Sequence, residues 1–193
     1  MTPMSTVASS SAAPAAGTRL HFFCGKAGAG KSRLAASIAA SEAAFLISED
    51  LWLARLFSDA MRSFDDYRVF SMRLRTVVEP VVVELSRAGR SVVLDCPANT
   101  RSTRCWIRSL IEQSGARHVL HFVDTPDATC LERIARRNLE RPEGSHHLTP
   151  EQFALISSSF EPPGAQEGFH VKRHGVGPQG PLSTPVSAQH GLR

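Results

Sequence analysis

The sequence predicts an α/β fold in which a parallel β-sheet lies between two layers of helices. Short apolar runs of strand length alternate along the chain with longer segments of helical periodicity. These runs are apolar at successive positions, which is typical of strands that are buried on both faces of a parallel sheet. A glycine-rich segment, residues 25–32, joins the first run directly to the first helix. Together these observations favour a three-layer α/β/α domain.

The expected elements follow one another in strand–helix order. The strand-like runs cover residues 20–24, 44–48, 91–95 and 118–124, and residues 169–171 form a short fifth. Helices are expected at 31–43, 49–57, 67–89, 101–114 and 127–138. Pro80 should kink or split the long third helix. A last helix should begin after Thr149, with Pro150 in its first position and Gln152 closing a capping box.

The glycine-rich segment is a complete phosphate-binding loop with the sequence G-K-A-G-A-G-K-S. Glycines let backbone N–H groups approach phosphate oxygens, and Lys31 places a positive charge on the β- and γ-phosphates. The Ser32 hydroxyl can ligate Mg²⁺, and the following helix adds its positive end. The alternative is a glycine-rich turn that binds nothing. We expect ATP and Mg²⁺ as cofactors, with these nucleotide-binding residues: Gly25, Lys26, Ala27, Gly28, Ala29, Gly30, Lys31, Ser32 and Arg33.

Composition is that of an ordinary globular protein, with 42% hydrophobic and 21% charged residues in 193. The net charge of +4 comes without a dense basic block, so we expect no nucleic-acid partner. No apolar run has the length of a membrane span, the start of the chain does not resemble a secretory signal, and the four cysteines form no C-x-x-C pair. We therefore expect a cytoplasmic protein with a disordered segment at 1–17, one domain at 18–174 with a lid at about 138–149, and a disordered tail at 175–193.

Acidic residues follow the second and third strands. Asp95 ends an apolar strand, where a carboxylate faces the ligand crevice of an α/β sheet and can bind Mg²⁺. An ordinary turn cap is the alternative. Glu49 and Asp50 should emerge at the same sheet edge, and an acid there can accept the proton of an acceptor hydroxyl. Their alternative role is to stabilise a helix N-terminus. Asp50 is the preferred catalytic candidate and Glu49 the second.

Arginines cluster in the helix and loop after the fourth strand: Arg133, Arg136, Arg137 and Arg141. Arg133 and Arg137 lie one turn apart and are predicted to stabilise a transferring phosphoryl group, with Lys31 and Asp50 as the other catalytic residues. A solvated helix face is the alternative. Further candidates carry weaker signals. Arg101 and Arg104 can reach an acceptor or lie on the surface, the pair at 146–147 fits a solvated loop, and Trp52 and Trp106 fit helix packing.

Four segments resemble a known group of small kinases. They are V-V-L-D-C-P-A-N-T-R at 92–101, H-V-L-H-F-V-D-T-P-D at 118–127, F-E-P-P at 160–163 and E-G-F at 167–169. Together with the phosphate-binding loop they are similar to the "predicted kinases" with an AAA-type ATP-binding domain. That P-loop NTPase group is related to polynucleotide kinase, chloramphenicol phosphotransferase, gluconate kinase and zeta-toxin kinases. The resemblance spans residues 19–174.

The resemblance implies a kinase-like fold with a five-stranded parallel sheet in the order 2-3-1-4-5 and a lid. It also implies that Lys31 and Ser32 hold nucleotide and Mg²⁺, that Asp50 faces the acceptor and that Arg137 belongs to the lid. One departure concerns the acceptor. Relatives carry Asp-x-x-Arg after strand two, whereas here Leu53 stands in place of that Arg, and Arg55 is out of phase. This favours a neutral or small acceptor over a polynucleotide.

The leading hypothesis is therefore an ATP-dependent phosphotransferase that acts on a hydroxyl of a small molecule. The first alternative is an ATP-binding switch or slow ATPase that regulates a protein partner, which the missing Arg favours. A toxin of the zeta kind is a third hypothesis, and it requires growth arrest on expression that Lys31→Ala removes.

Overall fold

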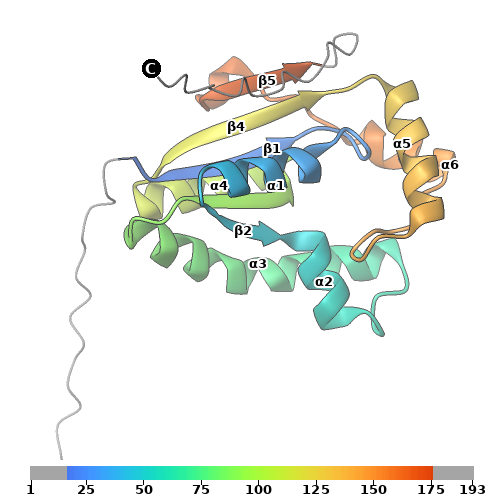
Figure 1. Ribbon diagram of the computed structural model, residues 1–193, viewed down its shortest axis with the longest axis horizontal. Helices are drawn as coiled ribbons and strands as arrows, with labels where there is room; N and C mark the ends of the chain where they lie inside the picture. Colours follow the sequence, from blue (N-terminus) through green and yellow to red (C-terminus); the bar gives the residue numbers. More distant parts are fainter. Residues whose placement is uncertain (1–16, 176–193) are drawn as a thin grey trace, which may run out of the picture.

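The computed structural model describes residues 17–175 (Figure 1). Apart from Gly17 and Gly175, the two segments expected to be disordered lie outside the described residues. Within the described range, no helix is both long and apolar enough to cross a membrane.

The central layer is a five-stranded sheet whose strands all run parallel. Its spatial order is β2-β3-β1-β4-β5, which confirms the predicted fold class (Figure 1). Since parallel strands end at one edge, the loops after β1, β2 and β3 gather there. The strands are β1 (Arg19–Cys24), β2 (Phe45–Ser48), β3 (Val92–Pro97), β4 (Arg117–Asp124) and β5 (Val171–Gly175).

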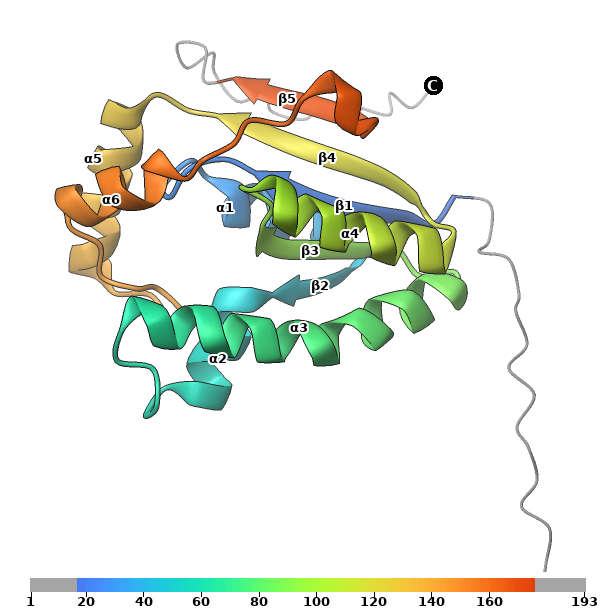
Figure 2. The ribbon, with the colours of Figure 1, turned by 180° about the vertical axis from the view of Figure 1, so that it is seen from behind.

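Helices cover the two faces of the sheet unequally. On one face lies α1 (Lys31–Ser41), while α3 (Phe64–Arg87) and α4 (Arg101–Ser114) cover the other (Figures 1 and 2). The short α2 (Glu49–Phe57) leads from β2 to α3. Both α5 (Asp127–Glu140) and α6 (Pro150–Ser158) stand at the carboxyl-terminal end of the sheet, and a 3₁₀ turn (Ala165–Glu167) precedes β5.

The apolar runs form strands because both of their faces are buried. Phe22 and Leu94 pack into the core beneath α3 and α4, whereas their neighbours Phe23 and Val93 pack against α1. A third apolar cluster, which includes Ile134 of α5, lies at the end of the sheet where the glycine-rich loop sits. Burying both faces of β1 and β3 fixes the loops that follow them.

Most element bounds differ from the prediction by a few residues, and three differences bear on the packing or the site. The helix α3 runs through Pro80 without a break. Because Pro80 has no N–H, the Thr76 carbonyl lacks its helical hydrogen-bond donor. Both residues are exposed to solvent. The last strand begins at Val171 rather than Phe169, because the Phe169 ring turns inward and packs edge-on against Phe22 at 5.3 Å. Helix α5 continues to Glu140, so the loop before α6 covers residues 141–149.

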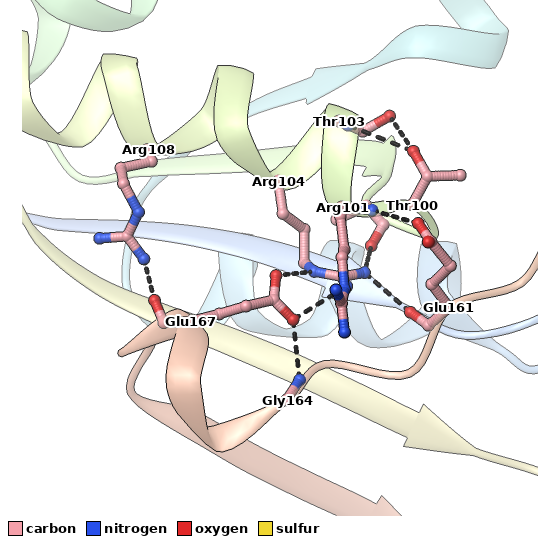
Figure 3. A network of polar contacts seen from close by, with 9 residues as sticks. Thr100, Arg101, Thr103, Arg104, Arg108, Glu161, Gly164 and Glu167 are labelled. Carbon is pink, nitrogen blue, oxygen red and sulfur yellow. Dashed lines mark hydrogen bonds and ion pairs between the residues drawn. The ribbon is translucent and has the colours of Figure 1, made fainter.

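A buried ion pair anchors the segment between α6 and β5 to α4 (Figure 3). Arg104 is fully buried, and its guanidinium binds both carboxylate oxygens of Glu167 at 2.6 and 3.0 Å. It also donates to the carbonyls of Ala98 and Glu161. Arg104 therefore has a structural role, and the expectation that it could touch an acceptor or lie on the surface was wrong.

Glu167→Ala should destabilise the protein by about 3–5 kcal/mol, because it leaves the Arg104 charge buried without its carboxylate. Urea unfolding followed by circular dichroism measures the change. The matched control is Glu84→Ala, which removes an exposed ion pair with Arg87 (3.1 Å) and should cost less than about 1 kcal/mol. Equal, small losses for the two variants would show that the buried pair contributes no more than a surface pair.

Candidate active site

The glycine-rich loop wraps tightly around the N-terminus of α1. Gly28 has a φ of +74°, and a Cβ atom there would lie 2.5 Å from the Cys130 carbonyl oxygen, so only glycine fits. Gly30 occupies the N-cap of α1, and no side chain caps that helix end. The loop thus presents a helix N-terminus of the kind that binds phosphate.

Side chains from three distant segments hold the loop in place. The Asn99 side-chain oxygen accepts from the Gly25 N–H at 2.9 Å, and the Thr125 hydroxyl donates to the Ala29 carbonyl at 3.0 Å. Arg133 of α5 donates to the same carbonyl at 2.9 Å. Asn99 and Thr125 lie within the segments at 92–101 and 118–127, but sequence reasoning missed their roles because their contacts with the loop span long sequence separations.

Lys31 points its ammonium group into the loop. Its Nζ donates to the carbonyls of Gly25 at 2.6 Å and Lys26 at 2.9 Å. Burial lowers the pKa of Lys31, while the nearby carboxylates of Asp95 and Asp50 oppose that shift. The cation and the strand-end acids predicted from the sequence therefore lie within electrostatic reach of one another.

Asp95 and Ser32 lie together beside Lys31. Burial raises the pKa of Asp95 to about 6, and hydrogen bonding from the Ser32 hydroxyl partly offsets it. A hydroxyl and a carboxylate oxygen are hard donors of the type that Mg²⁺ prefers. The raised pKa indicates a carboxylate whose charge a bound cation would stabilise. The residues present therefore fit a magnesium site.

Asp95→Asn should stabilise the ligand-free protein at pH 8 by about 2–3 kcal/mol. The Asp95 pKa is higher in the folded protein than in the unfolded chain, so the folded state binds more protons and stability falls as pH rises from about 4 to 6. The gain should shrink to nothing below that window. Urea unfolding between pH 4 and 8 measures it, with Asp124→Asn, an exposed acid that ends β4, as the control. A loss of stability at pH 8 would contradict the assigned pKa.

The two acids after β2 share a hydroxyl donor. The Tyr67 hydroxyl lies 3.1 Å from Glu49 Oε1 and 3.2 Å from Asp50 Oδ1, and the Ser71 hydroxyl donates to Glu49 at 2.6 Å. Glu49 is buried, and its Oε2 meets no partner with hydrogen-bond geometry, although the Cys96 thiol lies beside it. Burial and Glu49 raise the pKa of Asp50. Tyr67 and Ser71 were missed because they lie one helix further along the chain.

The loop at 141–149 lies over these acids and against α2. Arg55 of α2 forms a two-pronged ion pair with Glu143 at 2.8 and 3.0 Å. A Cβ atom on Gly144 would lie 3.1 Å from the Leu51 backbone, so loop and helix are in close contact. The His146 ring packs edge-on against Tyr67. Arg55, out of phase with the expected acceptor arginine, thus holds this loop.

Two of the four clustered arginines contact loops of the site, and the other two are exposed to solvent. Arg133 contacts the glycine-rich loop, and Arg137 donates to the His146 carbonyl at 3.3 Å while its buried Nε has no partner among the described residues. Arg136 is exposed and pairs with Glu140, and Arg141 is exposed at the helix end. Arg133 and Arg137 are the two that the fold brings to the site.

A cleft of about 390 Å³ opens beside the glycine-rich loop, between the ends of β4 and β5. Its walls include Lys26, Thr125, Pro126, Phe160 and Gly175. Lys26 pairs with Asp127 at its rim, at 2.6 Å.

The remaining candidates lie away from this centre. Arg33 is exposed on the first turn of α1, and the Arg101 backbone N–H donates to the Glu161 carboxylate. Trp52 and Trp106 pack against the main core. His147 is exposed in the loop.

Comparison with known proteins agrees with this arrangement. The family model for the AAA domain matches residues 20–163. A search of curated protein sequences finds no match. Among solved structures, the Mycobacterium tuberculosis APS kinase in complex with AMPPNP and APS is 21% identical, with a TM-score of 0.58 over 82% of this chain and 88% of that chain.

Two further structures share the fold. A sugar kinase from Janibacter sp. is 18% identical, with a TM-score of 0.56 over 82% of this chain and 85% of its own. Kti12 of Chaetomium thermophilum, in complex with ADP-AlF3, is 15% identical, with a TM-score of 0.59 over 80% of this chain and 88% of its own. At these identities the likeness shows the fold alone.

Proposed function

The chain belongs to the AAA domain family and carries a P-loop that binds nucleotide, and from that premise we propose that it is a kinase. It would transfer the γ-phosphate of ATP to a hydroxyl of a small molecule. The observation that carries this proposal is that acids from two strand ends lie near Lys31 of the P-loop, while Arg133 of α5 contacts the P-loop and Arg137 contacts the loop at 141–149. A nucleotide cradle alone does not require them.

The nucleotide would lie along the loop with its phosphates on the N-terminus of α1. Lys31 would leave the two loop carbonyls and bind the β- and γ-phosphates. The cleft beside Lys26 and Phe160 would take the base, since it opens from the loop and Pro126 and Phe160 in its mixed polar and apolar walls can contact a ring. Ser32 and Asp95 would hold Mg²⁺, which neutralises phosphate charge when bound.

Asp50 would orient the acceptor hydroxyl and take its proton. Its raised pKa suits a group that exchanges a proton, and Tyr67 fixes the carboxylate by donating to it. Arg133 and Arg137 would face the transferring group from α5. Arg137 has a free buried N–H for that purpose.

The acceptor would be a hydroxyl compound without a phosphate group. Glu49, Asp50 and Asp95 place three carboxylates around the transfer site: Glu49 raises the pKa of Asp50, and both of these acids raise the pKa of Asp95. Lys31, the cation among them, is committed to the nucleotide. Arg55, the other candidate to bind acceptor phosphate, is engaged by Glu143. A phosphorylated acceptor would therefore meet repulsion.

A switch or slow ATPase is the second candidate function. The loop at 141–149 contacts α2 through the Arg55–Glu143 pair and Gly144, and it contacts Tyr67 of α3 through His146, so Asp50 lies beneath it. If the loop stays in this position, no acceptor can reach Asp50. The protein would then act on a partner through loop movement that depends on the bound nucleotide.

ADP release in the presence of Mg·ATP and matched acceptors distinguishes these functions. The acceptor sets are neutral polyols, amino sugars and sugar phosphates. We expect unphosphorylated compounds to stimulate ADP release in the wild type. Release that no acceptor stimulates would favour the switch, whereas stimulation by sugar phosphates alone would overturn only the acceptor class.

A further inference from the structure

We propose that a second cleft, at the sheet edge opposite the P-loop, binds a small molecule through a doubly charged phosphate or sulfate group. This rear cleft has a volume of about 550 Å³, within the range of metabolite sites. Residues at the amino-terminal ends of β1 and β4 line it, on the face that carries α1. Its charged and titratable walls include Arg19, His21, Glu42, Arg117, His121 and Lys172.

The cations of the rear cleft stand where they repel one another. Arg19 and Arg117 are register partners on the adjacent strands β1 and β4, so two guanidinium groups leave neighbouring positions on the same face. Like charges in such positions destabilise a sheet. Lys172 is the register partner of His121 on the next strand. Glu42 is the single carboxylate of the cleft walls, and it faces Arg19 at 3.6 Å. A bound dianion would remove this excess of positive charge.

A chain of three histidines crosses the sheet from this cleft. His21 Nε2 lies 3.2 Å from Glu42, His21 Nδ1 lies 3.0 Å from His121 Nε2, and His121 Nδ1 lies 2.9 Å from His174 Nε2. One pattern satisfies every contact with neutral rings: each histidine donates toward Glu42 and accepts from the next. His21 and His121 are buried. They therefore put polar rings at sheet positions that apolar residues usually occupy.

No helix covers this half of the sheet within residues 17–175. The α1 helix lies over β1 and β3, and Figure 1 shows no labelled helix over the same face of β4 and β5. The side chains of Arg19, Arg117 and Lys172 are exposed and can meet a ligand directly, whereas His21 and His121 are buried. The positive charge of the cleft walls favours an anion. Because the cleft volume exceeds that of a bare ion, the ligand would be a small molecule that carries the anionic group.

Binding of a dianion should take up protons. Burial, together with the neighbouring histidines and Lys172, lowers the pKa of His121 to about 3, and burial also lowers the pKa values of His21 and His174. Arg19 and Lys172 oppose protonation of His21, and Lys172 also opposes that of His121 and His174, whereas Glu42 favours protonation of His21. A bound dianion reverses that balance and raises the histidine pKa values, so affinity should fall as pH rises through the bound-state values.

The test is a sulfate titration of the full chain, with ADP and Mg²⁺ present in excess to occupy the P-loop. Sulfate stays a dianion from pH 5.5 to 8, and ¹H–¹⁵N NMR of the histidine rings reports the site. We expect saturable shifts at His21 and His121, with binding at least about threefold tighter at pH 5.5 than at pH 8. Inorganic phosphate at pH 8, where it is also mainly a dianion, shows which group binds more tightly.

Arg117→Gln combined with Lys172→Gln should weaken sulfate binding at least tenfold. The control pair, Arg68→Gln with Arg73→Gln, removes the same charge from exposed positions on α3, on the other face of the sheet, and should leave binding unchanged. Equal weakening by the two pairs, or histidine shifts that chloride reproduces at the same ionic strength, would overturn the proposal. Shifts at other residues without any at His21 and His121 would do so too.

Discussion

Lys31→Ala should reduce ATP turnover by about 10²- to 10³-fold or more, because it removes the cation that binds the phosphates whose charge grows during transfer. Its Nζ lies within the P-loop, bound to two loop carbonyls, so no neighbouring side chain can replace it. The measurement is ADP release under saturating Mg·ATP. The fold should survive, because burial already disfavours the charged form of this lysine.

Arg68→Ala serves as the control for this substitution. It removes a cation that is 71% exposed on α3 and far from the P-loop in sequence, so turnover should not change. Circular dichroism confirms that both variants are folded. If Lys31→Ala keeps full turnover, the P-loop has been assigned the wrong role.

Asp50→Asn should reduce phosphoryl transfer by about 10²- to 10⁴-fold while changing nucleotide affinity less than about threefold. The amide keeps the shape of the side chain and its contact with Tyr67 but cannot take a proton. Transfer rates and the Kd for an ATP analogue, measured on the same preparation, separate the two effects.

Asp65→Asn makes the same chemical change at an acid that is 90% exposed in the first turn of α3. It should alter neither quantity. If Asp50→Asn lowers transfer and nucleotide affinity together, Asp50 serves only as an acid that stabilises the start of α2.

The fold was predictable because its signals are local. Apolar runs, the P-loop and the capping box formed by Thr149 and Gln152 can each be recognised within a few residues, and the folded chain contains the corresponding strands and capping box. The errors came from contacts between distant segments. Phe169 leaves the expected strand because Phe22 and His118 receive its ring, and Arg104 is buried because Glu167 meets it.

The candidate site was predictable to the same extent. Lys31, Ser32, Asp50 and Asp95 stand at loop or strand ends, and the parallel topology alone brings such positions together. The contacts of the residues that hold these groups join distant segments, so the sequence alone does not indicate them. Asn99 and Thr125 support the loop, and Tyr67 bridges two acids, only because the folded chain returns to this edge.

Arg55 illustrates what the sequence could not decide. Its spacing from Asp50 differs from the Asp-x-x-Arg spacing of the expected acceptor arginine. The spacing alone does not indicate which other residue Arg55 contacts. The structure pairs it with Glu143, so it ties α2 to the loop that covers Asp50.

The fate of the γ-phosphate tests the central claim most directly. The wild-type chain is incubated with γ-labelled ATP, Mg²⁺ and the pool of unphosphorylated hydroxyl compounds, and the products are separated. Our account predicts label in an organic phosphate ester in amounts that match ADP, and at least about 10²-fold slower ester formation with Asp50→Asn. Label recovered only as inorganic phosphate, with every acceptor, would contradict it.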